Sequence, residues 1–268
     1  MELKDSVIIH GPGKSGTTLL NDILALHPQL FWISTYTNRF PALPVLSILN
    51  NFQSIPWIEK TTRGKQNFPR PAEPFNYFSH HITDFRLNLS SFKPEEKMNL
   101  IHSLNQVSAL QKGERLITKI TGPSRSDFLN DIFGSPYVIW IDRDPKSIIA
   151  SYFKYKWRYK NNLEEFSSKQ KKELIREYAE YYNWIKKEKD QLKKFKFKRV
   201  TYEALIHDPL NFFRELCHFL DLDYPRSFQK TILSWNIRKN TNQQFTDVFN
   251  KEEVRYLESL LIEPYEQE

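Results

Sequence analysis

The chain has 268 residues, of which 40% are hydrophobic and 26% charged, and its net charge is +7. This composition excludes wholesale disorder, and the length suffices for one large domain with a real core. The single cysteine, Cys217, excludes an internal disulfide and a thiolate metal cluster, and we expect it to be a buried structural thiol. We expect neither a signal peptide nor a membrane span, and hence a cytoplasmic protein.

The positive charge indicates anionic partners of some kind, such as a nucleotide, an acidic glycan or a nucleic acid. Basic residues gather at 154–160 and 186–199, the first run interleaved with aromatic residues that could stack on bases. No recognised nucleic-acid module accompanies them, so we expect no nucleic-acid partner.

Residues 5–27 predict a strand, a tight turn and a helix. The apolar run at 6–10 leads into G-P-G-K-S-G-T-T, which is followed by L-L-N-D-I-L-A-L. The glycines and proline bend the chain, and the first backbone N–H groups of the helix then point unpaired into the turn. With Lys14 and the hydroxyls of Ser15, Thr17 and Thr18, this turn predicts a phosphate or sulfate site. The alternative is a turn without a ligand, which would need neither the lysine nor the hydroxyls.

The next stretch predicts a buried strand at 30–34 and then irregular structure. Residues 36–74 contain six prolines and read as helix fragments joined by a long loop. Loops of that length inside a compact domain are usually functional or mobile. We therefore expect 36–92 to be an insertion that forms a lid or borders a substrate site.

The remainder of the chain alternates between strand and helix patterns. Met98, Ile101, Leu104, Val107 and Leu110 recur at intervals of three and predict an amphipathic helix. A strand that alternates with helices in this way indicates a parallel sheet with helices on both faces. We predict an α/β fold in a single domain over 1–268. Its further strands are 115–120, 137–142 and 197–202, and its further helices are 124–133 capped by Ser124, one beginning at Pro145 behind Asp144, 168–194, 209–221, 225–234 and 250–262.

A second candidate site lies where the strand 137–142 ends. Arg143 follows this strand, and Ser151 comes eight positions later on the next helix. The two side chains could flank one anionic group that lies alongside the helix. The planar fork of arginine binds phosphate in a bidentate manner. The alternative is a salt bridge from Arg143 to Asp142 or Asp144.

The two motifs together resemble those of sulfotransferases that use 3′-phosphoadenosine 5′-phosphosulfate (PAPS). The loop resembles their 5′-phosphosulfate loop, and R-D-P-K-S-I-I-A-S resembles their 3′-phosphate motif, closer to bacterial and carbohydrate-type members than to aryl-type enzymes. The resemblance implies a P-loop-like sulfotransferase fold and sulfuryl transfer from PAPS to a hydroxyl or amine of a small-molecule or glycan acceptor. It implies donor contacts from Gly13, Lys14, Ser15, Gly16, Thr17, Thr18, Arg143 and Ser151.

Two further segments resemble the family less closely. Tyr202 lies in T-Y-E-A-L, similar to a Y-E-D-L segment near the adenine, with Ala204 in place of the acid. Arg238 and Lys239 resemble an R-K-G segment that closes over the 3′-phosphate, but the glycine is missing. A core tyrosine and a solvated basic turn remain the alternatives.

The resemblance also assigns the chemistry. Lys14 would stabilise the leaving 3′-phosphoadenosine 5′-phosphate (PAP), and Lys119 matches a lysine near the sulfuryl group, unless it is an ordinary lysine at a strand end. The catalytic base is left open. Many glycan-type sulfotransferases use a glutamate after the first helix, but this chain has no glutamate between Glu2 and Glu59. Glu73, held between prolines, is the first choice; His80 and His81 follow, since an imidazole titrates near ~6.5. We expect no metal.

Two other functions remain open. A P-loop kinase would share the cradle and the sheet, and Asp142 could hold its Mg²⁺, but its loop places Lys directly after the last Gly. Here Lys14 precedes Gly16. A nucleotide or polyanion binding module without catalysis is the other alternative. For the acceptor, a sugar-stacking and a phenol-binding pocket both remain possible, with Trp32, Tyr36, Asn38, Arg39, Trp57 and 75–81 as candidate lining residues.

Overall fold

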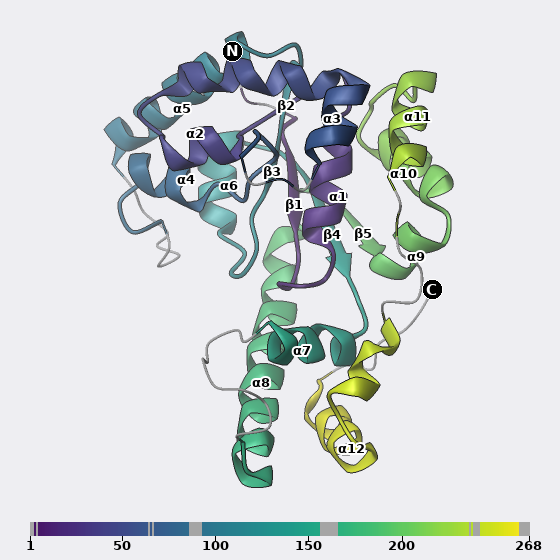
Figure 1. Cartoon of the computed structure of the whole chain (residues 1–268). Coiled ribbons are helices and arrows are strands. Elements are labelled where there is room, and N and C mark those ends of the chain that lie inside the picture. Colours follow the sequence, from purple (N-terminus) through teal and green to yellow (C-terminus); the bar gives the residue numbers. More distant parts are fainter. Residues whose placement is uncertain are drawn as a thin grey trace.

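A five-stranded parallel sheet forms the centre of the molecule. The computed structural model describes residues 3, 5–63, 65, 67–85, 93–155, 166–235, 237 and 242–262. The strands lie in the order β2-β3-β1-β4-β5, every pair is parallel, and helices lie on both faces of the sheet (Figure 1). This confirms the predicted α/β class. The strands are β1 (Val7–His10), β2 (Leu30–Trp32), β3 (Arg115–Lys119), β4 (Tyr137–Asp142) and β5 (Lys196–Thr201).

The N-terminal helices include those of the predicted insertion. The stretch expected to be irregular contains several short helices, one of them of the 3₁₀ type, and Glu73 lies just before the last of these. The elements are α1 (Thr17–Leu24), α2 (Thr35–Arg39), η1 (Pro44–Ser54), α3 (Pro56–Thr62), α4 (Phe75–His81), α5 (Pro94–Ala109) and α6 (Ser126–Phe133).

Two details of this half differ from the prediction. Ser124 does not cap α6, which begins after Arg125; its hydroxyl instead donates to Glu188 Oε2 at 2.8 Å. Met98 lies outside the buried face of α5 and is 64% exposed, because the buried residues Leu100, Leu104 and Val107 follow a 3.6-residue period rather than a strict spacing of three.

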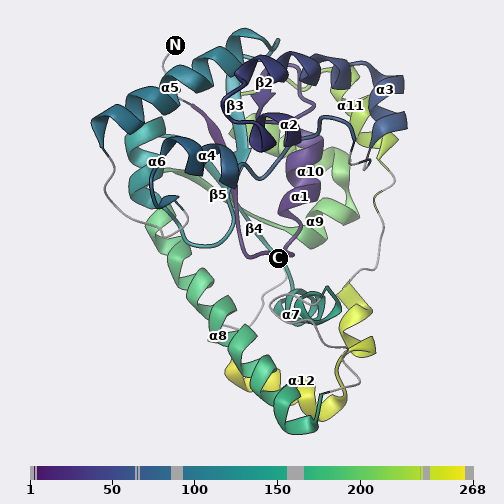
Figure 2. The same ribbon diagram turned by 60° about the vertical axis from the view of Figure 1, so that its left-hand side comes forward.

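The C-terminal half of the chain contains several helices, some of which lie near the carboxyl ends of the strands. Asp144 accepts a hydrogen bond from Lys146 N at 3.0 Å and so caps the helix that starts at Pro145, as predicted. In Figures 1 and 2, α7, α12 and the N-terminal part of α8 form a lobe beyond the carboxyl ends of the strands, while the C-terminal part of α8 runs back along one face of the sheet. The elements are α7 (Pro145–Lys154), α8 (Ser168–Leu192), α9 (Tyr202–His207), α10 (Pro209–Phe219), α11 (Arg226–Ser234), η4 (Asn242–Asp247) and α12 (Lys251–Leu260).

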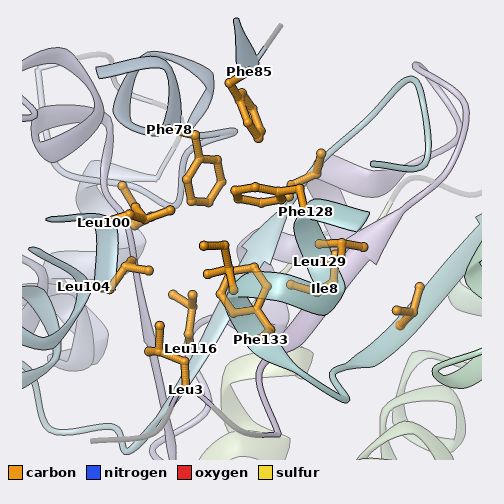
Figure 3. Packing of buried hydrophobic residues seen from close by; sticks show 14 of the residues in the cluster. Leu3, Ile8, Phe78, Phe85, Leu100, Leu104, Leu116, Phe128, Leu129 and Phe133 are labelled. Atoms are coloured by element: carbon orange, nitrogen blue, oxygen red, sulfur yellow. The ribbon is translucent and has the colours of Figure 1, made fainter. Parts of the chain in front are cut away.

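Each face of the sheet carries its own core, because side chains alternate along a strand. On one face, Ile8 belongs to a cluster in which Phe78, Phe85 and Phe128 lie against one another, with ring centroids 4.9–5.4 Å apart (Figure 3). On the other face, Val7 and Ile9 pack with helices α1, α10 and α11. Cys217 is buried there as predicted, and burial raises the pKa of its thiol to about 12.

Among the described residues, no helix is both long and apolar enough to cross a bilayer.

Candidate active site

The loop between β1 and α1 forms the predicted cradle at the carboxyl edge of the sheet. Gly16 caps α1 with φ of 100°, and Ser15 N donates to Pro12 O at 3.2 Å, which closes the turn. A Cβ atom on Gly16 would lie 2.4 Å from Cδ2 of Tyr202, so only glycine fits there. The first N–H groups of α1 have no partner within the helix. Ser15 Oγ is buried and has no hydrogen-bond partner in the described structure.

Side chains from α7 and from the end of β4 donate hydrogen bonds to backbone oxygens of this loop. Arg143 Nη1 donates to Lys14 O at 3.0 Å, and its guanidinium lies 4.5 Å from the ring centroid of Tyr202. Tyr152 donates its hydroxyl to Gly13 O at 3.0 Å. Ser151 lies on the same helix, where its hydroxyl donates to Ser147 O at 2.8 Å. The structure thus brings Tyr202 and Arg143 together at the loop.

Asp142 is engaged elsewhere. It is fully buried, and it accepts hydrogen bonds from Trp140 Nε1 at 2.8 Å, Lys186 Nζ at 3.2 Å and Arg199 Nε at 2.7 Å. Burial opposes its ionisation, but Lys186 and the hydrogen bonds outweigh burial and lower the pKa of this carboxyl. Asp144 caps α7. The two acids beside Arg143 in the sequence thus each have partners other than this arginine.

A polar cluster lies on the other side of the loop, where β3 ends. Lys119 is buried, and its Nζ donates to Thr18 Oγ1 at 2.9 Å and lies 3.4 Å from Glu73 Oε2. Glu73 Oε1 accepts from Thr121 N at 2.8 Å and also from the Thr121 hydroxyl. Two of the predicted catalytic residues, Lys119 and Glu73, are thus in contact. Thr121 was not among the predicted site residues, and its two hydrogen bonds orient the Glu73 carboxylate.

Lys14 reaches out of the loop toward an aromatic ring. Its Nζ lies 4.1 Å from the ring centroid of Tyr155, whose side chain is 65% exposed. Burial, and then the positive charge of Lys119, lower the pKa of the Lys14 ammonium. The two lysines therefore repel each other across the loop. Tyr155 belongs to the basic run 154–160 that is interleaved with aromatic residues, but the sequence did not indicate its contact with Lys14.

Asp22 is an ionisable residue near Lys119 that the motifs did not indicate. It lies on α1 four residues after Thr18, one turn along the same face. Burial raises the pKa of its carboxyl to about 7, an effect that Lys119 and Arg70 oppose and Glu59 reinforces. It lines a cavity of about 30 Å³ with Gln53 and Arg70, which has room for about one water molecule. The spacing from Thr18 could have revealed it.

The remaining candidates lie apart from this cluster. His80 and His81 end α4, where their rings are 4.9 Å apart and His81 also packs on Tyr77 at 5.1 Å. Burial and the charge of His80 lower the pKa of His81 to about 4. Among the described contacts, the two histidines touch their own helix rather than Lys14 or Lys119. Arg238 and Lys239 lie outside the described residues.

Comparison with known proteins identifies relatives of the whole fold. The profile of the sulfotransferase family matches residues 6–226 of the chain. No curated protein sequence matches it. Sulfotransferase STF9 from Mycobacterium avium is 16% identical with a TM-score of 0.59, and the match covers 88% of this chain and 68% of that one.

Two other solved structures are similar over longer stretches. The sulfotransferase domain of the Synechococcus PCC 7002 olefin synthase is 14% identical with a TM-score of 0.55, covering 95% of this chain and 93% of that one. Mouse sulfotransferase SULT7A1, solved in complex with PAP, is 13% identical with a TM-score of 0.52, covering 97% and 83%. At these identities the likeness shows that the fold is shared.

Proposed function

Since this chain belongs to the sulfotransferase family, we propose that it transfers a sulfuryl group from PAPS to a hydroxyl or amine of an acceptor. The observation that carries the proposal is the placement of Lys14, Lys119 and Glu73 around one loop, with a buried arginine behind it. A kinase is disfavoured, because Asp142, the acid it would need for Mg²⁺, is fully buried and bound to Lys186 and Arg199.

The loop offers donors that suit the 5′ end of PAPS. The unpaired N–H groups at the start of α1 and the orphaned hydroxyl of Ser15 would each gain a partner from an anion held in the turn. The pKa of the Lys14 ammonium, lowered by burial and by the charge of Lys119, should rise again when an anion lies between the two lysines. The PAP complex of the mouse enzyme with the same fold supports this assignment.

Arg143 and Ser151 would bind the 3′-phosphate. A guanidinium has five N–H donors, so Arg143 can hold the carbonyl of Lys14 and a phosphate together. This coupling ties the recognition of the 3′-phosphate to the position of the catalytic loop. The Ser151 hydroxyl donates within its helix, so it must rotate away from Ser147 O to donate to a phosphate. Tyr202 would face the adenine side of the same wall, and Arg238 and Lys239 remain candidates for closing over it.

Glu73 is the proposed base. Its carboxylate would take the acceptor's O–H proton while the new O–S bond forms and the bond from sulfur to the bridging oxygen breaks. Lys14 would stabilise the negative charge that passes to the departing 5′-phosphate, and Lys119 would stabilise the transferred group. The hydrogen bonds from Thr121 orient the carboxylate. His80 and His81 are weaker candidates because their described contacts lie within α4.

The acceptor would approach from the side of the insertion 36–92, to which Glu73 belongs. The structure of retinol dehydratase with retinol and PAP, and another with androsterone and PAP, show small hydroxyl compounds on this fold, at TM-scores of 0.50 and 0.52. In this chain the surroundings of Lys119 are polar, with Thr18, Glu73 and Thr121 in contact. This polarity favours a hydroxyl-rich acceptor such as a carbohydrate over a purely apolar one.

The proposal is tested by donor binding and transfer together. PAP should raise the melting temperature of the protein, and Glu73→Gln should lower kcat by about 10²–10⁴ with labelled PAPS and an acceptor library, while its PAP affinity stays unchanged. Glu95→Gln, an exposed acid on α5, is the matched control. Stabilisation by ATP with Mg²⁺ but not by PAP would contradict the assignment, and full activity of Glu73→Gln would exclude Glu73 as the base.

A further inference from the structure

We propose that a second cavity, between α3 and α11, binds an amphipathic anion, a molecule with an apolar body and one carboxylate, sulfate or phosphate group. The cavity has a volume of about 550 Å³, within the ordinary range for small-molecule sites. None of the residues proposed above for donor binding or proton transfer lines it, although Trp57, which does, was predicted from the sequence as a candidate acceptor contact.

The cavity lies away from the donor loop. Leu26 and Pro28, which line it, follow α1, whereas the loop of Lys14 precedes α1. The helix has eight residues and so separates the two regions by about 12 Å along its axis. Figures 1 and 2 both show α3 and α11 side by side at the end of α1 that is remote from α7. A ligand here would not contact the loop.

The walls are mainly apolar. Leu26 and Pro28 form one side, Phe228 of α11 is buried at 1% exposure, and Trp57 of α3 contributes a ring that remains 70% exposed. A tryptophan left this open on a concave surface is a large apolar area that a ligand could remove from water. The body of the ligand is therefore apolar.

The charge at the rim is positive. Lys60 of α3 and Lys230 of α11 both line the cavity, and neither has an ion pair or a hydrogen bond within the described residues. The lining also contains the acid Glu59, but both of its oxygens accept hydrogen bonds from Arg63, at 2.7 and 2.6 Å. The carboxylate is thus neutralised, and two cations from facing helices remain for an anionic group.

The cavity is already held open. Besides Glu59, Arg63 binds Ser234 of α11 through the backbone oxygen at 2.8 Å and the hydroxyl at 2.9 Å, and its guanidinium lies 4.2 Å from the ring centroid of Trp235. These bonds fix α3 against α11, so a ligand would meet preformed walls. A concave, two-helix site with a cation on each side suits a small anion better than a flat protein surface.

Titration calorimetry with decanoate and with decanol tests this inference. Decanoate should bind one per chain and several-fold more tightly than decanol, and added salt should reduce the difference. The double variant Lys60→Met/Lys230→Met should weaken decanoate about three- to ten-fold and leave decanol unchanged. Trp57→Ala should weaken both. Lys169→Met, an exposed lysine on α8, is the matched control and should change neither.

Equal affinity for decanoate and decanol, or unchanged decanoate binding in Trp57→Ala, would overturn the inference. So would a dimer in sedimentation that Trp57→Ala dissociates, because a second copy of the chain would then cover the cavity. PAP affinity should be the same in all these variants. A failure of PAP binding in the parent protein would therefore count against the proposed function and not against this cavity.

Discussion

Replacement of Asp22 by asparagine should stabilise the protein at neutral and alkaline pH but not in acid. The folded protein keeps the Asp22 proton up to about pH 7, whereas the unfolded chain loses it near the ordinary pKa of 3.8. Between these values the folded state binds the extra proton, so the free energy of unfolding falls as pH rises from about 4 to about 7. Above this window the cost of the buried charge is complete.

The shift gives an upper bound on the effect. A difference of about 3 pKa units corresponds to about 4 kcal/mol, at about 1.4 kcal/mol for each unit. Asparagine has nearly the shape of the protonated acid and never ionises. The variant should therefore match the parent at pH 4 and exceed its free energy of unfolding by up to about 4 kcal/mol at pH 8.

Urea unfolding of both proteins at pH 4, 6 and 8 measures the difference. Asp131→Asn, an exposed acid on α6, is the control and should show no such trend. An advantage of Asp22→Asn that is the same at every pH would refute the reasoning, because the gain would then come from packing or helix propensity. A loss of stability at pH 8 would show that the charged carboxylate has a favourable partner, which would point to Lys119 or Arg70.

Three other predictions follow from the contacts around the loop. Gly16→Ala, whose Cβ would lie 2.4 Å from a Tyr202 carbon at a φ of +100°, should cost about 1–3 kcal/mol and abolish the PAP-induced rise in melting temperature; a normal rise would show that the loop tolerates a side chain. Tyr155→Leu should raise the KM for PAPS several-fold and Tyr155→Phe should not, because the ring that lies under Lys14 remains; equal effects of both would contradict a cation–π contact. Asp142→Asn should lower the free energy of unfolding by about 3–5 kcal/mol in urea, because Lys186 and Arg199 lose their shared carboxylate, and a loss under 1 kcal/mol would contradict this.

The parts of the site that the sequence predicts are those built from neighbouring residues. The turn before α1 and the arginine at the end of β4 follow from glycines, an apolar run and a proline at the start of a helix, which are local features. The contacts that complete the site join distant residues. Thr18 meets Lys119, which is 101 positions away, and Glu73 meets Thr121 across 48 positions.

Local features were also insufficient where a distant partner competes for the same group. Ser124 is a good capping residue by type, but Glu188 and Gln191 of α8 take its hydroxyl, and α6 starts later. Glu73 was favoured for its flanking prolines, and the two histidines for their chemistry. Only the fold distinguishes them, because Glu73 contacts Thr121 and Lys119 just before α4 begins, whereas His80 and His81 lie in the last turn of that helix.

The pairing of the acids explains why positive charge remains around the loop. Asp142 pairs with Lys186 and Arg199, and Asp144 caps the start of α7, so each of these acids has partners other than Arg143. Asp22 lies near Lys119 but, with its pKa raised to about 7 by burial, is largely protonated just below neutral pH. Among the described residues, Glu73 is then the one carboxylate in an ion pair with Lys119. The ammonium group of Lys14 lies against the neutral ring of Tyr155. The arrangement keeps the cations available for an anionic donor, and Asp22→Glu, with a longer side chain that could reach Lys119, should weaken PAP binding at pH 8 more than at pH 5.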